Sequence, residues 1–498
     1  MRTSAYLQRM LAGSIGVWMV LSVVSPPRSI AGSRGDTLAL TLPGCIRMAQ
    51  EHGPAGEMAR QSYRSKEQSH RAFDAGFLPQ LSLSGDAPGF YRSINSIVQP
   101  DGSTTFEQQR QASSSLGLQL SQKIAATGTE LSLFSGLNRI DLIESDISYY
   151  RSTPLTLSLR QPIFSINPLA WSREIDDLQY RGARREYVEA MEDVATQVTD
   201  QFFSVYLAAM NVNNAALNCA INDTLYQISK GRYNVGKIAE QDLLQSELAS
   251  LNSRTQLENA RLSYDRAAQT LRNALGLPPD QPLDVRPDTD IPPIAVDAER
   301  ALNYARANRS DMLNFELERL TAARNVRQAE SDNSLSMSVS ANLGYNQKAT
   351  QLNQAYVNLL DQQQFSVRFD VPLFGWGTGT HAVESARAEQ ERVKVAVEQQ
   401  RFTFEQEVVY QVRRLQQLQL QVGVSAKADT IAQRRFDVAR ERYVIGKIDV
   451  PILFIAQEEK DNAYRARIQT LWDYWATYYR VRRLTLYDFA LQRALYKE

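Results

Sequence analysis

Cysteine is almost absent from this chain of 498 residues, which contains only Cys45 and Cys219. Two cysteines allow one disulfide bond at most, so a disulfide framework is excluded. Cys45 ends the segment TLPGC, which resembles a lipoprotein acylation motif, but it lies about twenty residues beyond the N-terminal apolar run. That separation is too long for signal-linked lipidation, and we therefore expect Cys45 to be a small buried residue.

Histidine is nearly as scarce, because His52, His70 and His381 are the only three and none has a ligand-spaced partner in the sequence. The sequence also lacks a P-loop, a nucleophile elbow and a cluster of cysteine with histidine. We therefore expect no enzymatic activity, no metal site and no cofactor.

Neither sign of charge is in excess, because 55 lysine and arginine residues balance 55 aspartate and glutamate residues. This balance gives no indication of a nucleic-acid partner. After the N-terminal segment the sequence has no run of about eighteen apolar residues, the length that a transmembrane helix requires. If the chain crosses a membrane, we expect it to do so with strands.

Residues 1–31 have the features of a secretory signal peptide. Arg2 and Arg9 precede the apolar run MLAGSIGVWMVLSVV, and a cleavage region follows at Ser29-Ile30-Ala31. We therefore expect an exported protein. The alternative is an uncleaved N-terminal anchor.

A short motif occurs twice in the sequence. RYNVGKI begins at Arg232 and RYVIGKI begins at Arg442, 210 positions later (442 − 232). The same offset places Gln161–Phe164 on Val371–Phe374, and the halves align without a gap from about residue 155 to about residue 240. The sequence therefore predicts two structural repeats.

Each half has the same order of patterns. PLTLSLRQPIF and SLSMSVSANLGY alternate apolar with polar residues, as strands with one apolar face do. Long proline-free stretches follow, with apolar residues every three or four positions. A helix of about 55–60 residues is about 85–90 Å long, wider than a compact domain, so we expect projecting helical hairpins. A shorter opening helix is expected before the strands, at about 39–74 and about 297–331.

The expected divisions of the chain follow from these patterns. They are a signal peptide at 1–31, a first repeat at 32–277 (strands at about 77–164 with an insertion at about 92–150, helices at about 170–276), a proline-rich linker at 278–295, a second repeat at 296–490 (strands at about 334–375, helices at about 381–490) and a C-terminal tail at 491–498.

The repeated motif lies where one long helix ends and the next begins. Gly236 and Gly446 permit the positive φ that such a reversal needs. Asp449, with Pro451 two residues later, is typical of a helix start, and Asp242 is expected in the first turn of the other returning helix. The sequence therefore predicts two hairpin tips.

These motifs, in this order, resemble the outer membrane efflux protein (TolC) family. The matching segments are RYNVGKIAEQDLL, RYVIGKIDVPILF, QPIFSINPLAW, VPLFGWGTGTH, LALTLPGCIRMAQ and AERALNYARANRSDM. The resemblance covers roughly residues 37–490. It implies an α+β membrane protein in which three protomers share an outer-membrane β-barrel, with about four or more strands from each, continued by a long periplasmic α-helical barrel.

The resemblance also implies a function and partners. The homotrimer would be the outer-membrane exit duct of a tripartite efflux system and would extend into the periplasm. It would receive substrates through a periplasmic adaptor protein from an inner-membrane pump or ABC transporter. One alternative is the outer-membrane component of type I protein secretion, and another is a periplasmic coiled-coil adaptor or scaffold without a pore.

The resemblance assigns roles to particular residues. The expected adaptor contacts at the tips are Arg232, Tyr233, Gly236, Lys237, Ile238, Arg442, Tyr443, Gly446, Lys447 and Ile448. For Lys237 and Lys447 the alternative is a solvated charge in the turn. Asp242, Ile452 and Ile455 are expected at the periplasmic mouth, where apolar packing would dominate; the alternative for Asp242 is a helix cap. Trp171 and Trp376 are expected at the membrane interface, and junction packing is their alternative.

Two segments leave alternatives open. Within the insertion, SLGLQLSQKI and TELSLFSGLN alternate like a strand pair, which would either add to the barrel or form an extracellular cover. The stretch WDYWATYYRVRRLTLY places Trp472, Trp475 and Tyr479 at helical spacing, which favours packing against neighbouring helices over a ligand site.

Overall fold

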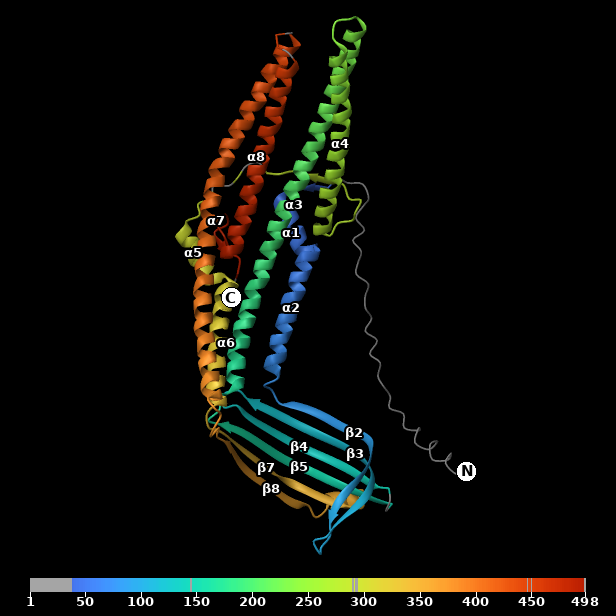
Figure 1. Ribbon diagram of the computed structural model, residues 1–498, viewed down its shortest axis with the longest axis vertical. Coiled ribbons are helices and arrows are strands. Elements are labelled where there is room, and N and C mark those ends of the chain that lie inside the picture. The colour runs from blue at the N-terminus through green and yellow to red at the C-terminus, as the bar shows by residue number, and fades with distance from the viewer. Residues whose placement is uncertain are drawn as a thin grey trace, which may run out of the picture.

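The computed structural model describes residues 38–143, 146–288, 291, 294–445, 447–448 and 450–496. The expected signal peptide lies outside these residues. The chain is elongated, with a sheet at one end and the tips of two helical hairpins at the other (Figure 1).

Helices make up most of the described residues. They are α1 Leu42–His52, α2 Pro54–Ala75, α3 Pro168–Asn234, α4 Glu240–Leu275, α5 Ala298–Asn308, α6 Ser310–Asp332, α7 Thr378–Val444 and α8 Val450–Thr485. Among the described residues, none of these helices is both long enough and apolar enough to cross a membrane.

The first helix of each hairpin exceeds its expected length of about 55–60 residues, whereas the returning helix is shorter. Helices α3 and α7 each contain 67 residues, and α4 and α8 each contain 36. A helix of 67 residues is about 100 Å long. The starts of α3 and α7, at residues 168 and 378, are separated by the same 210 positions as the repeated motif.

The single opening helices expected at about 39–74 and 297–331 are wrong, because each is broken into two. Pro54 begins α2 directly after Gly53, since a proline has no N–H to continue α1. Arg309 separates α5 from α6 with an extended backbone, and its side chain is buried.

Six long strands form one antiparallel sheet. They are β2 Gln80–Val98, β3 Thr104–Ile124, β4 Thr129–Leu142, β5 Ile147–Ile163, β7 Ser336–Ala349 and β8 Leu360–Asp370, paired in that order. Strands β3 and β4 come from the inserted segment, and both are hydrogen-bonded inside the sheet. The short 3₁₀ helix η1, Leu352–Tyr356, lies in the connection between β7 and β8.

Short paired strands hold the connecting segments in place. Strand β1, Leu38–Leu40, pairs in parallel with β6, Leu283–Val285, which lies inside the expected proline-rich linker. The helices of the second repeat are expected at about 381–490, and α8 ends at Thr485. The chain then turns back, and β9, Tyr487–Asp488, pairs with β10, Arg493–Ala494.

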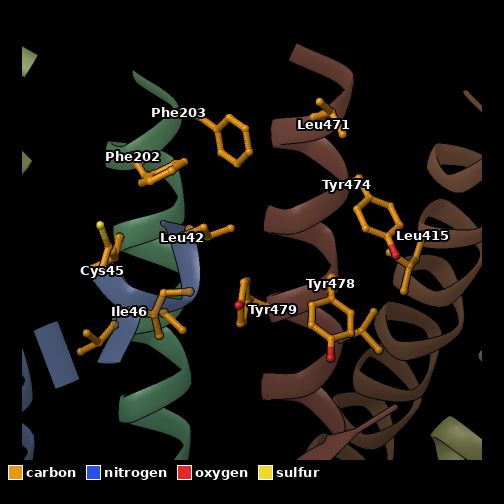
Figure 2. Close-up of a cluster of buried hydrophobic side chains, with 14 of the residues drawn as sticks. Leu42, Cys45, Ile46, Phe202, Phe203, Leu415, Leu471, Tyr474, Tyr478 and Tyr479 are labelled. Carbon is orange, nitrogen blue, oxygen red and sulfur yellow. The ribbon is translucent and has the colours of Figure 1, made fainter. Parts of the chain in front are cut away.

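The main hydrophobic core lies where α1, α3, α7 and α8 meet (Figure 2). Phe202, Phe203 and Tyr474 are almost fully buried there. Trp472 and Trp475 pack against this cluster, so the packing interpretation of the aromatic stretch is confirmed. Cys45 is fully buried, as expected, and burial raises the pKa of its thiol to about 12. Both cysteines are free thiols.

Candidate functional site: hairpin tips and a two-faced sheet

The first tip joins α3 to α4 through a turn at Gly236. Its φ of 69° lies in the left-handed region, which favours glycine. The N–H of Gly236 donates to the Tyr233 carbonyl at 2.8 Å, and that of Lys237 donates to the Arg232 carbonyl at 2.9 Å. Arg232, Tyr233 and Lys237 are exposed, whereas Ile238 is half-buried. The tip therefore presents cationic and aromatic side chains to solvent.

The second tip has the matching hydrogen bond. The N–H of Lys447 donates to the Arg442 carbonyl at 2.8 Å, at the positions equivalent to Lys237 and Arg232. Arg442 and Lys447 are exposed and Ile448 is half-buried. Gly446, Asp449 and the side chain of Tyr443 lie outside the described residues. The two tips lie apart at the same end of the molecule (Figure 1).

The residues assigned to the periplasmic mouth lie just beyond the tips. Asp242 is in the first turn of α4, as expected, and its side chain is exposed. Ile452 and Ile455 lie in the first two turns of α8 and are 50% and 54% exposed. In the single chain, these two isoleucines therefore present apolar surface that is not covered.

A groove lies between the two hairpins behind the tips. Its volume is about 470 Å³, and its apolar lining includes Ile221, Leu225, Ile228, Phe436, Leu453 and Phe454. This groove could not be predicted from the sequence, because its lining comes from three separate helices, α3, α7 and α8. The available signal was the apolar residues that directly follow the second tip.

The sheet has two faces of opposite character. One row of directly opposed residues crosses all six strands and is polar throughout: Gln80, Ser121, Ser132, Ser158, Asn342 and Gln364. The next row on the other face contains Leu81, Leu120, Leu133, Leu157 and Leu343, and it ends with Gln363 on β8. Successive residues of a strand point to opposite faces, so the alternation in the sequence produces this separation.

The apolar face is largely uncovered in the single chain. Leu81 is 67% exposed and Phe365 is 71% exposed. The two tryptophans lie beside this sheet, at the strand-to-helix junctions. Trp171 is half-buried in the first turn of α3, whereas Trp376 is 88% exposed and makes an edge contact with Phe374 at 4.6 Å. An apolar surface of this extent requires a partner of low polarity.

A buried ion-pair network connects α3 to the break between α5 and α6. Arg309 Nη1 lies 3.0 Å from Glu189 Oε2, and Arg309 Nη2 lies 2.5 Å from Asp311 Oδ2. The N–H of Ser310 donates to Glu189 Oε1 at 2.8 Å. Burial raises the pKa of Glu189, against the opposing effect of Arg309 and the Ser310 hydrogen bonds. In the sequence, the segment NRSD is recognisable only as part of a family motif, and it does not indicate this pairing.

A second network connects α3 to α8 and the C-terminal segment. Arg482 Nη2 lies 2.8 Å from Glu192 Oε1, and Nη1 lies 3.2 Å from Asp488 Oδ2. The hydroxyl of Tyr478 donates to Asp488 Oδ1 at 2.8 Å. Burial raises the pKa of Glu192 and by itself would lower that of Arg482, but the two carboxylates raise the pKa of Arg482.

His70 has two carboxylate partners that were not expected from the sequence. Its Nδ1 lies 2.5 Å from Asp176 Oδ2, and its Nε2 lies 3.5 Å from Asp74 Oδ2. The expectation that no histidine has a ligand-spaced partner is therefore wrong for His70, because α2 places Asp74 one turn away and α3 adds Asp176. Among the described residues, these three have ligand atoms close enough together to hold a metal ion. The ring also stacks on Tyr180 and links α2 to α3.

The same fold occurs in solved outer-membrane channels. The chain is similar to the CmeC channel of Campylobacter jejuni (15% identity, TM-score 0.64, covering 92% of this chain and 87% of that chain). It is also similar to VceC of Vibrio cholerae (16% identity, TM-score 0.60, 91% and 97% covered). A third similar structure is the open state of MtrE of Neisseria gonorrhoeae (14% identity, TM-score 0.58, 92% and 91% covered).

No curated protein sequence matches this chain. The family described as outer membrane efflux protein matches residues 45–277 and 301–471, which is more than half of the chain. The chain therefore belongs to the outer membrane efflux protein family, and it is a transport protein of the outer membrane.

Proposed function

We propose that three copies of this chain form the outer-membrane exit duct of a tripartite efflux system. The observation that carries this proposal is the six-stranded sheet, which has a polar and an apolar face and continues into long helices. Within the described residues, β2 and β8 form the two edges of this sheet. Open strand edges are not tolerated in lipid, so the edges must join those of other copies to close a barrel.

In the closed barrel, the two faces of the sheet have different surroundings. The leucine row faces outer-membrane lipid, and the row of serine, asparagine and glutamine faces water. Trp376, at the junction between sheet and helix, lies at the membrane interface, where amphipathic rings are favoured. The helices beyond this junction then extend the duct into the periplasm as a helical barrel.

The equal lengths of the paired helices support two structural repeats that each contribute one hairpin to this duct. The exposed residues of both tips form the surface for the periplasmic adaptor, which connects the duct to an inner-membrane pump or ABC transporter. The duct itself conducts passively. Family membership favours this function over that of a periplasmic adaptor without a pore.

The proposed function predicts a homotrimer in the outer membrane. We expect chemical cross-linking of the detergent-extracted protein to yield trimers, and membrane fractionation to recover the chain with the outer membrane. Monomers alone, or recovery in the soluble periplasm, would contradict the proposal. Identification of the inner-membrane partner that co-purifies with the trimer distinguishes efflux from type I protein secretion.

Substitution of Gly236 by proline tests the role of the tips. Proline requires a φ near −65° and has no N–H, so it cannot adopt the φ of 69° or donate to the Tyr233 carbonyl. We expect Gly236→Pro to leave a trimer in the membrane but to abolish most export. Gly231→Ala is the control, because Gly231 lies in α3 with open space around an added Cβ. Export at the wild-type level in Gly236→Pro would refute the docking role.

The mouth residues predict an apolar closure with weak cation selectivity. Asp242 contributes one carboxylate per protomer, and exposed charges are screened over about 8–10 Å at physiological salt. Burying an isoleucine contributes about 1.5–3 kcal/mol. We therefore expect Ile452→Ser with Ile455→Ser to shift the closed–open equilibrium by about tenfold or more and raise the resting conductance in planar bilayers.

The alternative that the planar-bilayer measurement tests is a mouth gated by charge. Strong block by trivalent cations in the wild type, lost in Asp242→Asn, would show that a carboxylate ring controls entry and would contradict the apolar closure.

A further inference from the structure

We infer that the β3–β4 hairpin widens the barrel until its bore equals that of the helical conduit, so the duct admits polar cargo about 25 Å across at its membrane end. This inference rests on the proposed trimeric duct and specifies the size and chemistry of its cargo. It follows from the position of the hairpin in the sheet, the circumferences of the two barrels and the character of the polar face.

The hairpin is part of the barrel wall and is anchored at its helical end. Strand β3 pairs with β2 and β4 pairs with β5 over nearly the whole length of β4. The turn between β3 and β4 contacts the start of α3, where Asn167 Nδ2 donates to the Ala125 carbonyl at 2.7 Å. The same Asn167 caps α3 by accepting from the N–H of Leu169 at 3.1 Å. A hairpin fixed to the helix start cannot serve as a movable extracellular cover.

The faces of the inserted strands agree with those of their neighbours. Leu120 and Leu133 continue the leucine row that begins at Leu81, and Ser121 and Ser132 continue the polar row that begins at Gln80. The insertion therefore extends both the lipid-facing and the water-facing surface in register. A strand pair folded over the opening would not need this register.

The helices beside the sheet lie side by side in the same order as the strands that they join. Helix α2 contacts α3, α3 contacts α6, and α6 contacts α7. In the chain, α2 leads into β2, α3 follows β5, α6 leads into β7 and α7 follows β8. In a trimer they form a ring of twelve helices, whose circumference is about 110–120 Å at a spacing of about 9–10 Å.

The circumference of the barrel depends on the number of strands. Three six-stranded sheets give eighteen strands. Spaced by about 4.8 Å and tilted by about 40°, they span about 110 Å, which equals the helical ring. Without β3 and β4, twelve strands at the same tilt would span about 75 Å. Each circumference divided by π gives the diameter of the barrel at its backbone. Subtracting about 5 Å of side chain on each side from that diameter leaves a bore of about 25 Å with the hairpin and about 14 Å without it.

The polar face keeps this bore open. Phe134 is a large side chain on the polar face of β4, but its ring lies against the sheet over Gly117 and Gly136, which are opposite one another. A Cβ at Gly117 would lie 2.8 Å from the ring, and one at Gly136 would lie 2.6 Å from it. Glycine at both positions therefore lets the ring lie flat. The remaining wall is rich in serine, asparagine and glutamine, which suits a hydrated polar cargo.

Deletion of Thr104–Leu142 tests the inference. The deletion removes β3 and β4 and connects β2 to β5 through residues 99–103 and 143–146, which preserves the antiparallel order. Ser340→Cys on the polar face, in a Cys219→Ala background, reports access from outside when intact cells receive maleimide polymers of graded size. We expect the largest polymer that labels the deletion variant to be about half as wide as the largest that labels the full chain. Leu343→Cys, on the apolar face, controls for labelling that does not depend on the bore.

Equal size limits in two variants that are both trimeric in the outer membrane would overturn the inference while leaving the proposed duct intact. If the deletion variant does not assemble, electron microscopy of the wild-type trimer decides. A closed wall of eighteen strands supports the inference, and a wall of twelve with the hairpin outside it refutes it. A wild-type chain that is not a trimer would instead refute the proposed function.

Discussion

Replacing Arg309 with methionine is expected to lower the free energy of unfolding by about 3–5 kcal/mol. Arg309 is 5% exposed, and its guanidinium contacts Glu189 and Asp311. Methionine has a similar length but no charge. The substitution therefore leaves the carboxylate of Glu189 buried without its cation, and this uncompensated charge is the main cost.

The double variant Arg309→Met with Glu189→Gln separates lost charge from lost packing. Removing both charges should restore most of the stability, because a neutral amide at position 189 still accepts from the N–H of Ser310. The matched control is Arg306→Met. Arg306 pairs with Glu405 at 2.8 Å, but its side chain is 46% exposed, and exposed pairs contribute about 0–1 kcal/mol.

The stability of the single variant Arg309→Met is predicted to depend on pH. Burial already raises the pKa of Glu189, and loss of Arg309 removes an effect that lowers it. A carboxyl whose pKa is higher in the folded state than in the unfolded state stabilises the fold at low pH and loses that contribution as the pH rises. The difference in the free energy of unfolding between the wild type and Arg309→Met should therefore become smaller as the pH falls from neutral. The stability is measured by urea unfolding of the detergent-extracted protein, followed by helical circular dichroism.

A constant deficit across that pH range, or a double variant no more stable than the single one, would show that packing around Arg309 matters more than its charge.

Replacing Phe202 with alanine is expected to cost a similar amount, about 3–5 kcal/mol. Phe202 is fully buried, and its ring packs edge-on against that of Phe203, with the ring centroids 5.5 Å apart. It lies at the junction of α1 and α3 (Figure 2). Truncation leaves a cavity that two long helices cannot close without bending. Since this cluster holds the hairpins together in mid-molecule, we also expect the proposed trimer to dissociate at a lower temperature.

Phe202→Leu is the conservative control. Leucine keeps most of the buried volume, so its cost should be below about 1.5 kcal/mol. Thermal dissociation of the proposed trimer on semi-native gels compares both variants with the wild type. Equal dissociation temperatures for Phe202→Ala and the wild type would mean that the core at α1 and α3 does not limit the stability of the assembly.

The local features of this fold could be predicted from the sequence. A two-residue alternation predicted two-faced strands, and a period near 3.6 with no proline predicted long helices. Gly236 marked the turn between α3 and α4, because few other residues adopt its positive φ. These features depend on residues that are close in sequence, where steric and periodic preferences act without help from the rest of the chain.

Other features depend on contacts between residues far apart in sequence, and these became known only from the tertiary structure. The sequence could not determine that Glu189 pairs with Arg309, or that Asp176 lies beside His70, because such contacts form only when separate helices pack together. It also left open whether the inserted strands form a cover or extend the sheet. Their hydrogen bonds to β2 and β5 settle their place in the sheet, since an alternating strand can pair with any edge that matches its faces.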